Sequence, residues 1–303
     1  MSELTPPAIQ VTIVEGGRFD IWCAENTGFC FGVERAVKLA QDAAARLGKV
    51  YSLGPIIHNT DVVDALAKEG ILVARNLDEV DDSAVIARSH GLPPDVLEEA
   101  NRRGIRIIDG TCPFVKKAQD YAALLRREGY HILIVGNADH PEVKALLGFS
   151  GHDAQIVGSE SDVNLPDGTS RIGVISQTTE RIHIFSRVVA SVVAQAKEVR
   201  VFNTVCDSAL SRRSNTLKLA EMCDVVVVVG GKHSANTKQL AAAARQHGTD
   251  TYHIERPEEL EDQWFEGKRN VGVTVGASTP VWITSAVVKR LREISLSIVR
   301  IMD

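Results

Sequence analysis

Short apolar runs alternate with longer amphipathic stretches along most of this 303-residue chain. The run Val225–Val229 consists of valine alone, which is typical of a strand buried on both faces of a sheet. Stretches such as Val115–Glu128 place apolar residues three and four positions apart, which predicts helices with one buried face. Strands and helices in alternation favour an α/β fold with parallel sheets covered by helices.

The same pattern predicts the individual elements. The strands are Phe19–Ala24, Val50–Ser52, Ala84–Arg88, Ile105–Asp109, His131–Val135, Gln155–Val157, Arg171–Ile175, Glu198–Asn203, Asp224–Val229, Thr251–Ile254 and Asn270–Thr274. The helices are Val33–Leu47, Thr60–Glu69, Pro94–Arg103, Val115–Glu128, His140–Leu147, Thr179–Ala196, Ser211–Cys223, Thr237–Gln246 and Ser285–Met302. We expect a poorly ordered N-terminal extension at 1–18 and three compact α/β lobes at 19–112, 113–205 and 206–303, the last with a C-terminal helix.

Composition narrows the class of protein. Hydrophobic residues make up 44% and charged residues 24% of the chain, as in ordinary globular proteins. The net charge of −5 argues against nucleic acid as the main partner, because binding a phosphate backbone requires a basic face. Without a membrane-spanning apolar run or a signal peptide, we expect a cytoplasmic protein with no membrane partner and with reduced thiols. Five cysteines then indicate ligands, nucleophiles or core residues rather than disulfides.

Three of the cysteines occupy loops that follow predicted strands. Cys30, Cys112 and Cys206 lie one near each lobe junction, and ligands of parallel sheets bind beyond the carboxyl ends of strands. Their wide spacing is uninformative by itself, since buried free cysteine is common. Their equivalent placement favours thiolates that close on one iron–sulfur cluster and leave one iron without a protein ligand. Cys23 and Cys223 lack this placement, and we interpret both as core or near-surface thiols.

Anion-binding groups recur in the same kind of loop. Imidazole donates hydrogen bonds that suit phosphate, and three histidines follow strands: His58, His90 and His140. A glycine-initiated loop, 230–237, leads into a helix and contains Ser234 and Asn236, while Ser278 lies in a second loop of this kind. Backbone N–H groups at a helix N-terminus attract phosphate. Simple N-capping by Ser234 or Asn236 is an equally good interpretation of that loop alone.

One carboxylate belongs to these strand-end motifs. Glu142 follows His140 and Pro141 and is a candidate proton donor inside a dry pocket. Thr178, after another strand, is a candidate partner in the same proton relay. Stabilisation of a helix dipole by a first-turn Glu142 is the simpler interpretation, and both roles are compatible.

Together the motifs resemble the 4-hydroxy-3-methylbut-2-enyl diphosphate reductase family, the last enzyme of the non-mevalonate isoprenoid pathway. The similarity spans about residues 20–290. It rests on GFCFGVERAV at 28–37, LGPIIHN at 53–59, RSHG at 88–91, DGTCPFVKK at 109–117, HPEV at 140–143, SQTT at 176–179, NTVC at 203–206, the 230–237 loop and GVTVGASTP at 272–280.

This resemblance implies a trefoil of three pseudo-symmetric α/β lobes around a central [4Fe–4S] cluster. Cys30, Cys112 and Cys206 would be the cluster ligands. The diphosphate would be held by His58, His90, His140, Ser234, Asn236 and Ser278. Glu142 would protonate the leaving hydroxyl, with Thr178 nearby. The implied reaction is a two-electron reductive dehydroxylation that yields isopentenyl and dimethylallyl diphosphate, with ferredoxin or flavodoxin as the electron donor.

The sequence also departs from the family pattern. Ala235 replaces the second serine of the phosphate loop, and after Cys206 only Arg212 keeps its place, while Ala209 and Arg213 replace a threonine and a glutamine. These changes leave open a divergent homologue that acts on another phosphorylated allylic alcohol. A non-catalytic iron–sulfur redox sensor and a nucleotide-binding α/β protein with incidental cysteines are the remaining alternatives.

Overall fold

The computed structural model describes residues 11–14, 17–25, 27–57, 59–81 and 84–297. Its strands are β1 (Val11–Val14), β2 (Asp20–Ala24), β3 (Val50–Leu53), β4 (Ile71–Ala74), β5 (Ala84–Ala87), β6 (Ile107–Asp109), β7 (His131–Val135), β8 (Ala154–Val157), β9 (Arg171–Ser176), β10 (Glu198–Val201), β11 (Val225–Val229), β12 (Asp250–Ile254) and β13 (Asn270–Val275). Its helices are α1 (Phe31–Leu47), α2 (Thr60–Lys68), α3 (Pro94–Arg102), α4 (Pro113–Arg127), α5 (Pro141–Phe149), α6 (Ile182–Val193), α7 (Asp207–Met222), α8 (Ala235–His247) and α9 (Val281–Ser297). Short 3₁₀ helices are η1 (Leu77–Glu79), η2 (Glu160–Asp162), η3 (Pro257–Glu259) and η4 (Asp262–Phe265).

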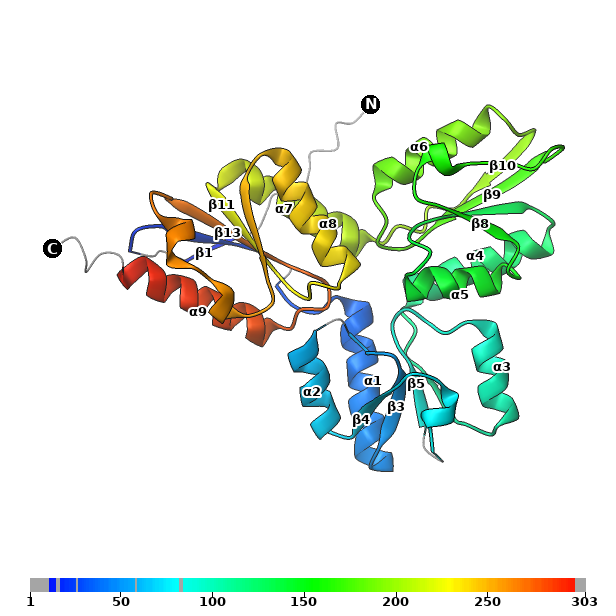
Figure 1. Cartoon of the computed structure of the whole chain (residues 1–303), viewed down its shortest axis with the longest axis horizontal. Coiled ribbons are helices and arrows are strands. Elements are labelled where there is room, and N and C mark those ends of the chain that lie inside the picture. Colours follow the sequence, from blue (N-terminus) through cyan, green and yellow to red (C-terminus); the bar gives the residue numbers. More distant parts are fainter. Residues whose placement is uncertain (1–10, 15–16, 26, 58, 82–83, 298–303) are drawn as a thin grey trace. The chain divides into compact units, whose positions relative to one another are not determined.

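The chain divides into two compact units. The first unit combines the described parts of Met1–Cys30, His58–Thr60 and Leu210–Asp303. Its sheet has the order β1-β2-β13-β11-β12, in which all pairs are parallel except the edge pair of β1 and β2 (Figure 1). Because β2, β13 and β11 are parallel neighbours, the loops that follow them leave the sheet at the same edge.

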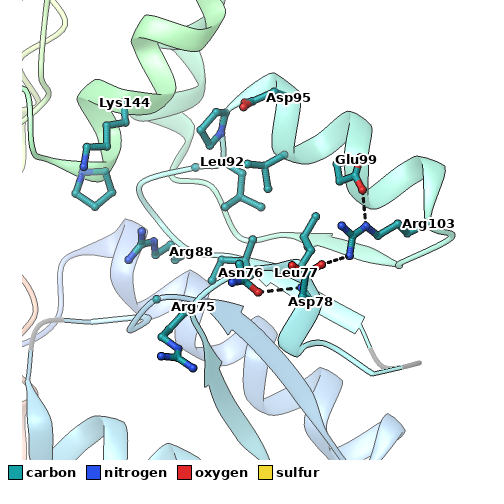
Figure 2. A pocket seen from close by; sticks show the side chains of 16 residues that line it. Arg75, Asn76, Leu77, Asp78, Arg88, Leu92, Asp95, Glu99, Arg103 and Lys144 are labelled. Atoms are coloured by element: carbon teal, nitrogen blue, oxygen red, sulfur yellow. Dashed lines mark hydrogen bonds and ion pairs between the residues drawn. The ribbon is translucent and has the colours of Figure 1, made fainter.

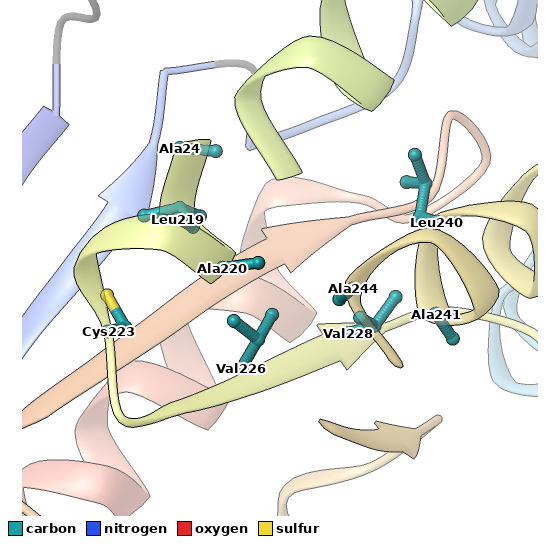
Figure 3. Close-up of a cluster of buried hydrophobic side chains, with 9 residues drawn as sticks. All are labelled: Ala24, Leu219, Ala220, Cys223, Val226, Val228, Leu240, Ala241 and Ala244. Carbon is teal, nitrogen blue, oxygen red and sulfur yellow. The ribbon is translucent and has the colours of Figure 1, made fainter. Parts of the chain in front are cut away.

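The core of the first unit explains the run of valines in β11. Val226 and Val228 pack with Leu219 of α7 and Leu240 of α8 in one buried cluster (Figure 3). All five valines of β11 are buried, so both faces of this strand are covered. Cys223 belongs to the same cluster, which confirms that this thiol is a core residue.

The second unit comprises the described parts of Phe31–Ile57 and Asp61–Ala209 and contains two fully parallel sheets. Their strand orders are β4-β3-β5-β6 and β10-β9-β7-β8. Helix α1 packs on β3 and β5, while α4 and α5 pack on the strands around β7. Among the described residues, no helix is long and apolar enough to cross a membrane.

The predicted fold class, α/β with three parallel-rich sheets, is confirmed. Each predicted strand and helix has a counterpart within a few residues, except that 298–302 of the last predicted helix lie outside the described residues. The prediction missed β4, a four-residue strand with one exposed position, and it was wrong for Val11–Val14, which form β1 within the expected extension. The boundaries after Cys112 and Val205 stay predictions.

The placement of the strand Phe19–Ala24 in the first lobe was wrong. Strand β2 pairs with β13 in parallel, so residues near the N-terminus complete the sheet of the C-terminal segment. Parallel pairing joins strands that are distant in sequence, and nothing in the local pattern of β2 specifies its partner.

Candidate functional site

Each of the three predicted cluster ligands directly precedes a helix. Cys30 is followed by α1, Cys112 is followed by α4, and Cys206 is followed by α7. The unpaired N–H groups at a helix N-terminus favour a thiolate over a thiol, because the helix dipole is positive there. All three thiols are partly exposed and free of disulfides, as metal ligands must be. Cys23 and Cys223 are buried instead, and burial raises their pKa values to about 11 and about 12.

The surroundings of two of these thiols are built for a sulfur atom. A Cβ at Gly32, in the first turn of α1, would stand only 2.5 Å from Cys112 Sγ, so glycine leaves the room that this thiol occupies. The N–H of Ala209 points at Cys206 Sγ from 3.4 Å. A hydrogen bond to sulfur stabilises negative charge on the ligand, which suits a cluster thiolate.

A backbone hydrogen bond ties every one of these cysteines to another strand-end loop. The Cys30 N–H donates to the Ala277 carbonyl at 2.9 Å, and Ala277 adjoins Ser278. The Cys112 N–H donates to the Ser89 carbonyl at 3.0 Å, and Ser89 adjoins His90. The third bond, 2.8 Å long, runs from the Cys206 N–H to the carbonyl of Thr178 itself. Each cysteine is thereby fixed beside a residue expected to contact substrate.

The candidate proton donor is a fully buried carboxyl group in the second unit. Glu142, in the first turn of α5, is 1% exposed. Its two oxygens accept hydrogen bonds from Thr178, one from the backbone N–H at 2.6 Å and one from Oγ1 at 2.9 Å. Burial raises the pKa of Glu142 from 4.5 to about 7, although both bonds from Thr178 lower it. Two hydrogen bonds thus join Glu142 to Thr178, and the raised pKa favours the protonated carboxyl more than in an exposed glutamate.

Sequence reasoning missed Thr204, which fastens the segment that leads to Cys206. Thr204 Oγ1 donates to the Ser176 carbonyl at 2.6 Å and accepts from the Ser176 N–H at 2.8 Å. All these atoms are buried. The bond pair fastens the segment that leads to Cys206 onto the end of β9, two residues before Thr178. The sequence signal that could have identified Thr204 is its position, two residues before the candidate ligand Cys206.

Two of the three predicted histidines lie together. The rings of His90 and His140 meet edge to face, with their centroids 5.1 Å apart. His140 is the N-cap of α5, and its Nδ1 accepts the Glu142 N–H at 3.2 Å. In the neutral ring the proton therefore sits on Nε2, which makes Nε2 a hydrogen-bond donor. His58 lies outside the described residues.

The phosphate-type loops lie in the first unit, after the adjacent strands β11 and β13. Ser234 is the N-cap of α8, where its side chain accepts the Thr237 N–H at 3.4 Å, so the capping interpretation holds. The hydroxyl hydrogen of Ser234 remains available to a ligand. In the two loops, three buried side-chain atoms have no hydrogen-bond partner among the described residues: Asn236 Nδ2, Thr237 Oγ1 and Ser278 Oγ. Such atoms are costly unless a ligand satisfies them, which favours an anion here.

Glycines bring these two loops into close contact. A Cβ at Gly276 would stand 2.0 Å from Thr237 Oγ1, and one at Gly230 would stand 2.6 Å from Thr279 Oγ1. No larger residue fits either position without separating the loops. Thr237 is therefore a further candidate that sequence reasoning did not single out.

Arg212 is a second buried group whose role the sequence did not reveal. It lies on α7, is 4% exposed, and donates to the Gly28 carbonyl at 2.8 Å and the Val275 carbonyl at 3.2 Å. Gly28 leads to Cys30, and Val275 leads to the loop of Ser278. This explains why the arginine is retained where its neighbours depart from the family pattern.

The structure thus groups the predicted residues by unit. In the second unit it joins Glu142 and Thr178 to Cys206, and it joins His90 to His140. The first unit joins Cys30 to the loop of Ser278. In neither unit do the described residues bring three His, Cys, Asp or Glu side chains within reach of one metal ion.

Comparisons with known proteins agree with this chemistry. A family described as "LytB protein" matches residues 21–292. The 4-hydroxy-3-methylbut-2-enyl diphosphate reductase of Geobacter metallireducens is 42% identical over 275 residues, which cover 91% of this chain and 98% of that protein. The reductase of the same name from Geotalea daltonii is 43% identical over 273 residues, which cover 90% of this chain and 96% of that protein.

Two solved structures are also similar. One is an (E)-4-hydroxy-3-methyl-but-2-enyl diphosphate reductase, described as the terminal enzyme of the non-mevalonate pathway, with a TM-score of 0.69, 40% identity and coverage of 90% of this chain and 99% of that chain. The other, a reductase from Plasmodium falciparum, has a TM-score of 0.84, 26% identity and coverage of 89% and 86%. With a match over most of its length and relatives above 40% identity, this chain belongs to the LytB protein family.

Proposed function

We propose that this chain is a 4-hydroxy-3-methylbut-2-enyl diphosphate reductase. It removes the allylic hydroxyl of its substrate as water, with two electrons and two protons, and forms isopentenyl and dimethylallyl diphosphate. The relatives that bear this name match over about nine-tenths of the chain, and they support an enzyme over a non-catalytic sensor or a nucleotide-binding protein.

The cofactor of this enzyme is a [4Fe–4S] cluster, and Cys30, Cys112 and Cys206 are its proposed ligands. The donor set fits, because each thiol is outside any disulfide, partly exposed and placed before a helix N-terminus. When bound, the cluster supplies electrons and a Lewis-acidic iron. Reduction in one-electron steps suits a small redox protein as donor, and ferredoxin or flavodoxin is the proposed partner.

The observation that carries this proposal is that each of the three cysteines donates a backbone hydrogen bond to a loop that follows a strand. Ala277, Ser89 and Thr178 provide the accepting carbonyls, and each is, or adjoins, a residue with a proposed role toward substrate. A cluster held by these cysteines is therefore coupled through single backbone bonds to the groups that bind and protonate the substrate. A core cysteine has no need of such a repeated arrangement.

The substrate's diphosphate is held by polar groups that follow strands in both units. Asn236 Nδ2 and Ser278 Oγ are buried and unpaired among the described residues, and Ser234 keeps a hydroxyl hydrogen to donate. His90 and His140 present imidazole donors from the second unit, and His58 completes the proposed set.

Glu142 delivers the proton that the departing hydroxyl needs. With a pKa of about 7, the carboxyl is about half protonated near neutral pH, whereas an ordinary glutamate is almost fully ionised. Thr178 fixes both carboxyl oxygens, which sets the direction in which the proton leaves. A dry surrounding keeps bulk water from protonating the substrate at random.

One substitution favours a second candidate, a homologue with another phosphorylated allylic alcohol as substrate. Ala235 is the first residue of α8, where the family's serine would add a hydroxyl donor to the phosphate loop. A substrate with fewer phosphate oxygens to satisfy would tolerate this loss.

Anaerobic assay with a panel of allylic phosphates separates the two candidates. We expect protein that carries its cluster, with a one-electron reductant, to convert the hydroxylated C5 diphosphate into both C5 products. Cluster-loaded protein that leaves this compound unchanged and reduces another member of the panel would overturn the first assignment. In that case Ala235→Ser should gain activity toward the C5 diphosphate, and the absence of any gain would weaken the second candidate.

A further inference from the structure

A pocket of about 530 Å³ lies at the carboxyl edge of the sheet β4-β3-β5-β6, within the second unit (Figure 2). It opens where the strand order reverses: β4 lies on one side of β3, and β5, the next strand in sequence, lies on the other. Parallel α/β sheets bind ligands at such switch points, and this volume suits a small organic molecule. None of the residues with a proposed role toward the substrate lines it.

Arg88, directly after β5, places a largely desolvated cation in the wall of this pocket. Its Nη1 donates to the Pro55 carbonyl at 3.3 Å, while its Nε is buried and has no hydrogen-bond partner among the described residues. Arg88 forms no ion pair with a carboxylate among the described residues, and burial lowers the pKa of its guanidinium. Arg88 is partly buried, and a partly desolvated charge without an ionic partner favours an anionic ligand as its counterion.

Two of the three carboxylates that share the wall form ion pairs elsewhere. Glu99 and Asp78 both form ion pairs with Arg103 at the far side of the pocket (Figure 2). Asp95 is exposed on the first turn of α3. None of these three carboxylates forms an ion pair with Arg88 in the described structure.

The backbone reserves the space that Arg88 occupies. Gly54, after β3, has a φ of +75°, and a Cβ there would stand 2.7 Å from Arg88 Nη1. Glycine meets both demands, the left-handed backbone and the close approach of a guanidinium.

Two more cations and an apolar surface complete the wall. Lys144 on α5 is exposed and forms no ion pair in the described part of the chain, and Figure 2 shows it on the same side of the pocket as Arg88. Arg75, after β4, adds a third cation, although it also pairs with Glu79. The apolar part of the wall is formed by Leu53, Leu77, Leu92, Pro93 and Val96.

We propose that this pocket binds a small organic phosphate at a site additional to that of the substrate. The phosphate group lies against Arg88 and Lys144, because a guanidinium and an ammonium suit a group of two or more negative charges. The carbon body covers Leu92 and Val96. Gly91 and Pro141, which follow His90 and His140, also line the pocket, so a bound ligand touches the segments that carry both histidines.

Calorimetric titration of the anaerobic, cluster-loaded protein tests this site with three probes: inorganic phosphate, adenosine monophosphate and dimethylallyl diphosphate. We expect binding of one organic phosphate that persists in Ser278→Ala, the variant in which the substrate loop is weakened. Arg88→Met and Lys144→Met should each weaken it about tenfold, since each removes a charged hydrogen bond. The tighter of the two organic probes identifies whether a nucleoside or a prenyl body is preferred.

Arg106→Met is the matched control, because Arg106 is exposed and lies outside the pocket, and it should leave the affinity unchanged. Lys144→Met alters only a surface side chain, so its affinity for the organic phosphate tests the proposed site even if Arg88→Met does not fold. Absence of any binding at millimolar concentration of the organic probes, or unchanged affinity in folded Arg88→Met or Lys144→Met, would overturn the proposal. Reductase activity measured on the same samples is an independent readout, so either assignment can fail without the other.

Discussion

Replacing Glu142 by glutamine should stabilise the protein at alkaline pH while it removes the proton donor. The two side chains have the same shape, and the Thr178 N–H can donate to the glutamine Oε1 as it does to the carboxylate. The Thr178 hydroxyl, which now donates to the carboxylate, can accept from the glutamine Nε2 instead. No buried hydrogen bond is lost, so the change isolates the charge.

The size of the effect follows from the raised pKa. Glu142 ionises at about 7 in the folded protein and at 4.5 when exposed, so between these values the folded state binds more protons than the unfolded state. Stability from this group is fully present below pH 4.5 and is lost as the pH rises through 7. At about 1.4 kcal/mol per pH unit, the loss reaches about 3 kcal/mol by pH 8. Glutamine carries no such penalty, so the variant should gain this amount relative to the parent.

Thermal unfolding of the anaerobic, cluster-loaded proteins measures the gain. At roughly 2–4 °C per kcal/mol, the Tm of Glu142→Gln should exceed that of the parent by about 6–12 °C at pH 8 and equal it at pH 4.5. Glu98→Gln on the exposed face of α3 is the control and should show no pH-dependent difference. A Tm difference that stays constant from pH 4.5 to 8 would refute the claim that burial raises the pKa of Glu142.

The same variant tests the chemical role. Loss of a positioned general acid costs about 10²–10⁴-fold in rate, so kcat should fall by this factor while the iron content of the protein is unchanged. In the parent, kcat should decline as the pH rises through about 7, because the acid form of Glu142 is then depleted. A variant that keeps the parental kcat and pH profile would show that another group provides the proton.

Three further outcomes follow from single contacts. Ser278→Ala should raise the stability of the ligand-free protein by about 1 kcal/mol, because the hydroxyl is buried without a partner, yet raise KM about tenfold; lower stability in denaturant titration would contradict this. Cys112→Ser should abolish the iron–sulfur absorption of anaerobically prepared protein, whereas Cys223→Ser should retain it, and equal loss in both would speak against the ligand assignment. Thr204→Val should cost about 2 kcal/mol in urea unfolding by leaving the Ser176 N–H unsatisfied, and Thr204→Ser should recover most of it.

The secondary structure was largely predictable because each buried strand has a local pattern. The valines of β11 and the largely apolar segment His131–Val135 of β7 predict strands, whichever strands they pair with. β4 was missed because its Ile71–Ala74 is short and half exposed, and a run of four residues does not distinguish a strand from a loop. The partner of β2 was not predictable, since β13 lies more than two hundred residues away and pairing depends on the whole sheet.

The candidate site divides in the same way. Residue types placed after strands predicted Glu142 and Thr178 as site residues, and the structure places the two in direct contact, while their role stays a prediction. The groups that hold the site in place were not visible in the sequence. Thr204 and Arg212 act through backbone carbonyls, and a carbonyl acceptor leaves no mark in the sequence because every residue has one.

The predicted starts of the three helices after the cysteines were two to four residues too late, and this error concealed that each cysteine directly precedes a helix. The pattern placed the starts at Val33, Val115 and Ser211, since apolar periodicity becomes visible only once a helix has made its first turn. The helices actually begin at Phe31, Pro113 and Asp207, directly after the three cysteines. The residues between the predicted and actual starts include the N–H groups that no helical carbonyl accepts, and these groups create the positive end of the dipole. Thiolate ligands are therefore favoured by a part of each helix that hydrophobic patterning does not detect, which is why strand-end placement alone left a core cysteine as a competing interpretation.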